Sequence, residues 1–297
     1  MNVNIRNYYA KDAQDIAEIN FLFNLAYQYN GDYKPENIFC AEIDNRVVAT
    51  GYLEPTESCE YLDKEGKDSN YVHRFILETD SHGYEQLEQE IFERILDRAT
   101  QIKKSYPHKK IQISHACEHT DLESIDFLFS KGFYHSLNYF IMKRDLTLPM
   151  PEYSLNHEIE IKRWAMGTEA EKELYLQAEE DSSGESWSKA RLNWFMAGSE
   201  WDTITAFHHG KPISSCMTWG ISSDRSATEQ IFTHPDWRRK GVARATIIET
   251  MRFLRDEKQK NEATLGVVGS NQAAIRLYKS LGYELIDIHL LMVKDIV

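Results

Sequence analysis

The feature that most constrains this chain is an internal repeat, whose two copies end its two halves. Residues 121–146, DLESIDFLFSKGFYHSLNYFIMKRDL, align without a gap with residues 271–296, NQAAIRLYKSLGYELIDIHLLMVKDI. The same residue recurs at Ile125 and Ile275, and at Gly132 and Gly282. Each copy predicts a short amphipathic helix, a glycine that ends it, and an apolar strand. The chain is therefore expected to contain one folding unit twice.

Weaker echoes of the repeat precede these segments. Residues 38–53 and 203–218 each predict a β-hairpin, with turns at Asp44-Asn45 and His209-Gly210. The stretch TLPMPEYSLNH at 147–157 holds two prolines and has no hydrophobic period, which is typical of a linker. We predict an α/β (α+β) fold with two domains, 1–148 and 158–297, joined by a linker at 149–157. Each domain is expected to have a mixed, mostly antiparallel central sheet flanked by helices.

The cysteines and the apolar runs exclude several classes of protein. None of Cys40, Cys59, Cys117 and Cys216 stands in a Cys-x-x-Cys pair, so each is expected to be a small buried residue. No apolar run approaches the roughly 20 residues that a membrane span needs. The first residues lack the pattern of a secretion signal. We therefore expect a cytoplasmic protein with no metal and no membrane partner.

The net charge of −13 bears on the partners of the chain. An acidic surface disfavours nucleic acid, whose binding depends on neutralising phosphates with basic side chains. It is compatible with a cationic substrate such as an amine, which the field of the protein would attract. The simpler alternative is that the charge only keeps the protein in solution.

A basic glycine turn stands out in the second half. Residues 228–233 predict a strand, and helical spacing of apolar residues begins at Val242. Between them lies Arg238-Arg239-Lys240-Gly241. The N–H groups at a helix N-terminus attract anions, and a glycine lets a pyrophosphate approach the backbone. The alternative is a solvated basic turn before an ordinary helix.

Two motifs in this region carry a family resemblance. The first is Arg238-x-x-Gly241-x-Ala243 at the predicted helix start. The second runs over 271–283 and has the form Asn-x-x-Ala-x-x-Leu-Tyr-x-x-x-Gly-Tyr. Together they resemble the signatures of the GNAT superfamily of acyl-CoA N-acyltransferases, and the resemblance of fold extends over 155–297. It implies acetyl-CoA, or another acyl-CoA, as co-substrate.

The resemblance also implies where the cofactor binds. Backbone amides of the turn would hold the CoA pyrophosphate, the strand before it would pair with the pantetheine arm, and Asn271 would hydrogen-bond the pantetheine. The splayed strands of the family would open a V-shaped cleft. The implied cofactor-binding residues are Ile231, Phe232, Thr233, Arg238, Arg239, Lys240, Gly241, Val242, Ala243, Arg244, Asn271, Ala274 and Tyr278.

Two side chains are implied in catalysis. Tyr278 would be the general acid for the departing thiolate, and its alternative is a packing aromatic. Glu229 would act through water as the base for the amine, and its alternatives are a solvated strand glutamate or a structural salt bridge. His234 is another candidate base, although a histidine beside a proline at a strand end is typical of the surface. The oxyanion donor would be the amide of Phe232 or of a neighbour.

The first half lacks these motifs. When Gly83 is matched to Gly241, Asp80 and Glu85 stand at the positions of Arg238 and Ala243, and carboxylates would repel a pyrophosphate. Leu128 stands at the position of the tyrosine. We predict a degenerate GNAT-like domain without acyl-CoA. A tandem arrangement with one working half resembles the architecture of mycothiol synthase.

The predicted function is that of an N-acetyltransferase, moving an acetyl group by direct attack to a primary amine of a small molecule or peptide. The acidic stretch 179–187, expected between helices, would bind a cationic amine with the help of Trp187, or would be a solvated loop. One alternative function is a non-catalytic acyl-CoA-binding regulatory or scaffold protein. Another is a partner-binding module built on two inactive domains. Longer acyl donors, several classes of amine and any oligomeric state stay open.

Overall fold

The computed structural model describes residues 3–56, 71–184 and 186–297, so Cys59 and Glu185 lie outside the described residues. The chain forms two compact units, the first of Met1–Ser136 with Leu290–Val297 and the second of Leu137–His289. None of the described helices combines the length and the apolarity that crossing a bilayer requires.

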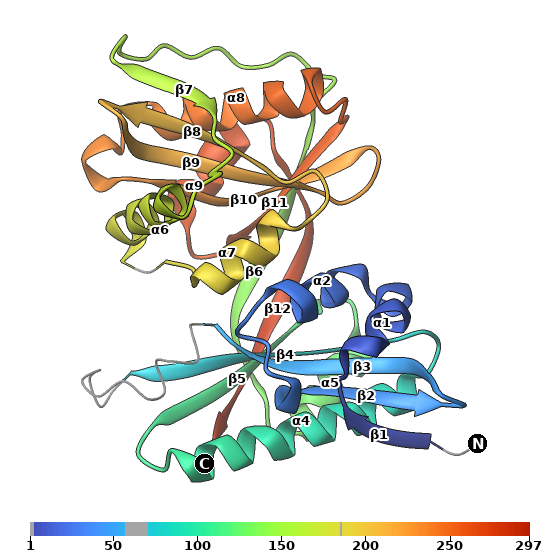
Figure 1. Cartoon of the computed structure of the whole chain (residues 1–297). Coiled ribbons are helices and arrows are strands. Elements are labelled where there is room, and N and C mark those ends of the chain that lie inside the picture. Colours follow the sequence, from blue (N-terminus) through green and yellow to red (C-terminus); the bar gives the residue numbers. More distant parts are fainter. Residues whose placement is uncertain (1–2, 57–70, 185) are drawn as a thin grey trace. The chain divides into compact units, whose positions relative to one another are not determined.

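The described elements occur in the same order in both halves, as the repeat predicts (Figure 1). The elements of the first half are β1 (Val3–Asn7), α1 (Ala13–Ile19), α2 (Phe21–Tyr29), β2 (Ile38–Ile43), β3 (Arg46–Pro55), β4 (Val72–Ser81), α4 (Glu85–Ser105), β5 (Lys110–Glu118), α5 (Leu122–Ser130) and β6 (Tyr134–Asp145). Those of the second are β7 (Ile159–Arg163), α6 (Glu169–Ser183), α7 (Lys189–Met196), β8 (Asp202–His208), β9 (Lys211–Gly220), β10 (Arg225–Thr233), α8 (Val242–Asp256), β11 (Glu262–Val268), α9 (Gln272–Ser280) and β12 (Glu284–Ile296). Short 3-10 turns lie at Ala10–Asp12, Pro35–Asn37 and Pro235–Trp237.

Each unit is built on a mostly antiparallel sheet. The strand order is β1-β2-β3-β4-β5-β12 in the first unit and β6-β11-β10-β9-β8-β7 in the second. The pairings β4–β5 and β10–β11 are parallel. In the first unit, α4 lies on one face of the sheet and α1 and α2 on the other (Figure 1). This confirms the predicted mixed sheet with flanking helices.

Both predicted hairpins are present. β2 pairs with β3, and β8 with β9, through tight turns in which both central residues have positive φ. The values are 50° and 65° at Asp44 and Asn45, and 49° and 76° at His209 and Gly210. Such turns match the right-handed twist of the flanking strands, and asparagine, aspartate and glycine adopt them most easily.

The boundaries between the two compact units fall inside strands. The chain passes from one unit to the other within β6 and again within β12. The end of β12 is held in the first unit, where Gln112 Nε2 donates to Asp295 Oδ1 at 3.0 Å and Tyr134 donates to Oδ2. The domains predicted at 1–148 and 158–297 divide the chain differently, because they follow sequence similarity rather than strand pairing. They stay a prediction about which half carries the function.

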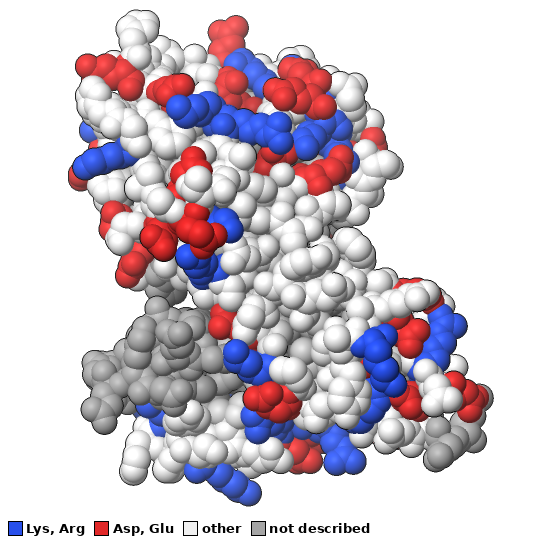
Figure 2. Space-filling model, in the orientation of Figure 1, with Lys and Arg blue, Asp and Glu red and all other residues white. Residues whose placement is uncertain are grey.

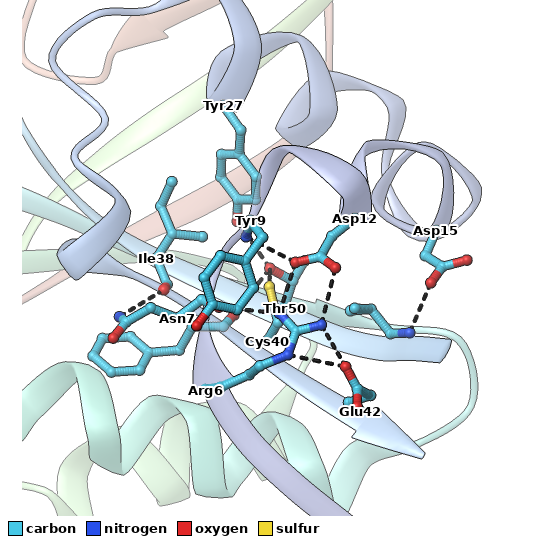
Figure 3. A network of polar contacts seen from close by, with 12 residues as sticks. Arg6, Asn7, Tyr9, Asp12, Asp15, Tyr27, Ile38, Cys40, Glu42 and Thr50 are labelled. Carbon is cyan, nitrogen blue, oxygen red and sulfur yellow. Dashed lines mark hydrogen bonds and ion pairs between the residues drawn. The ribbon is translucent and has the colours of Figure 1, made fainter. Parts of the chain in front are cut away.

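A buried ion network supports the first unit (Figure 3). Arg6 donates to both carboxylate oxygens of Asp12, at 2.7 and 2.9 Å, and its Nε donates to Glu42 at 2.9 Å. Asp12 is 4% exposed, so its charge needs this partner. The network ties β1 to β2 and to the turn before α1. We assign it a structural function.

The described cysteines behave as expected. Cys40, Cys117 and Cys216 are free and buried. Burial raises the pKa of each thiol, to about 12 for Cys40 and Cys216, so none is a ready thiolate.

Candidate functional site

The strand β10 leaves part of its edge open. It pairs with β11 only at Arg225, Ser226 and Ala227, whose partners are Glu262 to Thr264. Beyond Ala227 the two strands separate, and no pairing of described residues continues along that edge of β10. The separation that the sequence led us to expect is therefore present. An extended ligand can add to such an edge as a further strand.

A β-bulge deforms β10 in its pairing with β9, on the edge opposite the open one. Glu229 pairs with Met217 and Phe232 with Ser215, so β10 carries one extra residue at this point. Gln230 has a left-handed backbone with a φ of 43°. Bulges of this kind redirect backbone groups and are frequent next to active sites. Ile231, Phe232 and Thr233, three of the expected cofactor residues, follow directly.

The basic turn leads into a helix N-terminus, as predicted. Gly241 has a φ of 80° and precedes α8, and no described side chain caps that helix. The first amides of α8 have no acceptor within the helix, so they can meet an anion. Arg238 donates to the carbonyls of Thr233, at 3.2 Å, and Ser182. Its guanidinium therefore fixes the turn to β10 and α6.

The helix α9 presents the residues of the second motif. Asn271 caps the helix, because its Oδ1 accepts from the amide of Ala274 at 3.2 Å. Tyr278 is 7% exposed and its ring lies 5.9 Å from that of Tyr283. Burial, and then the proximity of Cys216, raise the pKa of Tyr278 well above its usual value. The phenol thus stays protonated at neutral pH, as a general acid must.

The two candidate bases have different surroundings. Glu229 is half-buried, and burial raises the pKa of its carboxyl, against the opposing effects of the Trp219 side chain and the Arg191 charge. A raised pKa suits a base that works near neutral pH. His234 instead holds the turn before α8, where its Nδ1 accepts from the amide of Asp236 at 3.3 Å. Glu229 therefore stays the first candidate for the base, and His234 the alternative.

A second carboxylate, which the sequence placed in the acidic stretch 179–187, lies beside the bulge. Glu179 is 4% exposed; one of its oxygens accepts from Gln230 Nε2 and the other from the amide of Trp187 at 2.9 Å. It therefore connects α6, the segment before α7 and the bulge of β10. Burial raises the pKa of Glu179 to about 7, although these hydrogen bonds and Arg191 oppose the shift.

The prediction of an acidic loop at 179–187 was wrong for its first part. Residues 179–183 belong to α6, where Tyr175 and Glu179 share the buried face. The spacing of four residues between them is the signal that could have placed Glu179 inward. Trp187 lies on an aromatic wall, with ring centroids 4.3 Å from Phe195, and Phe195 lies 6.2 Å from Trp219.

Glu179→Gln is expected to flatten the pH dependence of unfolding of the second unit. Because the folded pKa lies above the ordinary 4.5, the folded protein binds more protons than the unfolded chain between pH 4.5 and about 7. Glu179 therefore makes stability fall as pH rises through this window, by up to about 1.4 kcal/mol per pH unit. Urea unfolding can be followed by tryptophan fluorescence, since all the tryptophans lie at or beyond Trp164.

The exposed neighbour Glu180 provides the control, and Glu180→Gln should keep the wild-type pH dependence. If Glu179→Gln kept it as well, the assignment of the titration to Glu179 would be wrong.

A group of possible metal ligands also lies in the second unit. Glu158, His208 and His209 each offer an atom within 4.8 Å of the others, on the rim of the hairpin β8–β9. Trp237, next to the basic turn, packs on His208 at 4.6 Å between centroids. The expectation of no metal stays a prediction.

The second half of the chain is similar to known acetyltransferases. Residues 164–283 match the model of the family described as Acetyltransferase (GNAT) family. Mycothiol acetyltransferase of Acidothermus cellulolyticus is 25% identical over 164 residues, which make up 48% of this chain. The match spans 50% of that protein, so the chain aligns with about half of its relative's length.

Two solved structures share the fold over nearly the whole chain. A tandem GNAT protein from the clavulanic acid biosynthesis pathway has a TM-score of 0.67 and 10% identity, with coverage of 100% of this chain and 99% of that one. A GCN5-related N-acetyltransferase from Sphaerobacter thermophilus has a TM-score of 0.59 and 16% identity, with coverage of 99% and 96%. The fold of the chain is therefore that of two GNAT-like domains in tandem.

Proposed function

Because residues 164–283 match the model of the Acetyltransferase (GNAT) family, we propose that the chain transfers an acetyl group from acetyl-CoA to a primary amine. One observation carries the proposal: the open edge of β10 leads into the uncapped N-terminus of α8. The edge suits the pantetheine arm and the helix start suits the pyrophosphate. Both lie in the second unit, which also holds Glu229 and Tyr278.

The proposed residues divide the chemistry between them. The thioester supplies an activated acetyl group. Glu229, through a water molecule, takes a proton from the ammonium of the acceptor, so that the nitrogen has a free electron pair. As the C–N bond forms, the amide of Phe232 or a neighbour stabilises the oxyanion. As the C–S bond breaks, Tyr278 donates its proton to the sulfur, and the second proton that the nitrogen loses passes through water to the phenolate and restores Tyr278. The acceptor is an amine of a small molecule or a peptide.

We propose that the first unit does not bind acyl-CoA. The start of α4, which corresponds to the start of α8, follows Gly83 with its φ of 79° and carries Glu85 and Glu88 in its first turn. A cavity of about 370 Å³ lies there, and Asp121 and Glu123 also line it. Four carboxylates would repel a pyrophosphate.

The charge of the surface supports a small amine over a nucleic acid. Basic and acidic side chains are interspersed on the described part of the face shown in Figure 2. The net charge is −13. Binding along the backbone phosphates of a nucleic acid would require the opposite balance.

The test is a calorimetric titration of acetyl-CoA, followed by an assay of thiol release with a panel of amines. We expect one site per chain and amine-dependent release of CoA. Two sites would contradict the proposal for the first unit. Binding without release for any amine would favour the non-catalytic acyl-CoA-binding alternative. No binding at all would leave the partner-binding alternative.

A further inference from the structure

Arg191 is a cation without an ionic partner in the described structure. It lies on α7, its guanidinium stacks over Trp187 at 5.3 Å from the ring centroid, and the residue is half-buried. Its Nε is buried without a hydrogen-bond partner. Among the described residues no carboxylate lies within 4.0 Å of it, whereas Lys189 on the same helix pairs with Glu169 and Glu173.

The guanidinium belongs to the surroundings of the candidate base. Its charge lowers the pKa of both Glu179 and Glu229 against the effect of their burial. The contacts place it there as well, because Arg191 stacks on Trp187, whose amide donates to Glu179. Glu179 in turn accepts from Gln230, the residue that follows Glu229. Among the described residues Arg191 nevertheless forms an ion pair with neither carboxylate. Three elements, α6, α7 and β10, thus bring two carboxylates and one cation to the same aromatic wall.

A buried N–H group that lacks an acceptor destabilises a protein, so such a group is informative when it persists. Guanidinium groups bind carboxylates through two parallel hydrogen bonds, and stacking on an aromatic ring fixes the plane of the guanidinium for this contact. A singly charged carboxylate fits better than a doubly charged phosphate, because Glu179 and Glu229 repel negative charge.

We propose that Arg191 binds a carboxylate of the acceptor, so that the acceptor is an amine that also carries a carboxylate group. The ammonium end then faces Glu229, and the carboxylate end lies on the guanidinium above Trp187. This inference rests on the proposed function, and it narrows the amine to the class of amino acids and related aminocarboxylates.

The experiment compares amino acids with the matching amino amides, which lack the carboxylate. A series of α- and ω-amino acids of increasing chain length is assayed beside the corresponding amino amides, with acetyl-CoA and wild-type protein. We expect kcat/KM to be at least about tenfold higher for the preferred acid than for its amide, since a charge-assisted contact is lost with the amide. Arg191→Ala should remove this preference, mainly by raising the KM of the acid.

The controls separate binding of the carboxylate from packing. Lys189→Ala removes a cation from the same helix and should keep the preference for the acid. Arg191→Lys keeps the charge but not the two parallel hydrogen bonds, and should restore it only in part. The affinity for acetyl-CoA should be the same in all variants.

The inference would be overturned by equal turnover of acids and amides, by an equal loss for both in Arg191→Ala, or by a loss of acetyl-CoA affinity in that variant. If no acid is turned over, binding of the amino acid series to CoA-saturated protein is followed by tryptophan fluorescence. The absence of a saturable change in fluorescence would also overturn the inference. Failure of wild-type protein to bind acetyl-CoA would instead refute the proposed function itself.

Discussion

Gly241→Glu is expected to weaken acetyl-CoA binding by at least about 100-fold, which corresponds to about 3 kcal/mol. Gly241 has a φ of 80° at the start of α8. A Cβ there would meet Leu155 and the Ser154 carbonyl only at 3.9 Å, so the effect is not a steric clash. It comes from a carboxylate placed where the proposed pyrophosphate lies, and from strain in the turn. Calorimetry with acetyl-CoA measures it.

The chain supplies a matched control in Gly83→Glu. Gly83 has a φ of 79°, precedes α4, and has nothing within 4 Å of an added Cβ. The substitution introduces the same backbone strain, of about 1 kcal/mol, and the same charge. Because the first unit is proposed not to bind acyl-CoA, the affinity should stay at the wild-type value. A loss in Gly83→Glu equal to that in Gly241→Glu would contradict the assignment of the site to the second unit.

Local patterns in the sequence predict most of the fold. The glycines at 132 and 282 end their helices with left-handed backbones, at φ values of 79° and 85°. The predicted strand before the basic turn and the helix from Val242 are both present. Each of these features depends on residues close in the chain, so periodicity and turn chemistry are sufficient to find them.

The crossings between the units within β6 and β12 depend on contacts between distant residues. The pairing of Gln112 with Asp295 spans 183 residues. No local period carries such information, because apolar alternation in a strand specifies a buried face and not its neighbour.

The site residues also divide into those that local patterns predict and those that depend on contacts between distant residues. Motifs locate Gly241, Asn271 and Tyr278, and the structure gives each a definite place at a helix start or in the core. Glu179 and Arg191 belong to no motif, and their importance comes from the neighbours that folding supplies. Glu179 meets Gln230, which is 51 residues away in the chain. Substrate selection depends on such long-range contacts, so the sequence leaves the acceptor open while it indicates the cofactor.

Tyr278→Phe is expected to lower kcat by about 100-fold with little change in the affinity for acetyl-CoA. General acid–base catalysis contributes about 10²- to 10⁴-fold, and the low end applies because a thiol with a pKa near 8.5 is already a fair leaving group. Phenylalanine keeps the ring in its place beside Tyr283. Tyr283→Phe is the control, since its hydroxyl lies at 3.4 Å from Thr228 Oγ1 and has no proposed part in the reaction.

The leaving group distinguishes proton donation from packing. If Tyr278 protonates the departing sulfur, the defect of Tyr278→Phe should shrink when the acetyl donor is a thioester of a more acidic thiol, because that sulfur leaves without a proton. If the ring only packs against the core, the defect should be the same for both donors. An unchanged defect, or a loss of acetyl-CoA affinity, would mean that Tyr278 has only a packing function. Burial raises the pKa of Tyr278, so the phenol keeps its proton between pH 6 and 9. Deprotonation of Tyr278 should therefore not limit activity in this range.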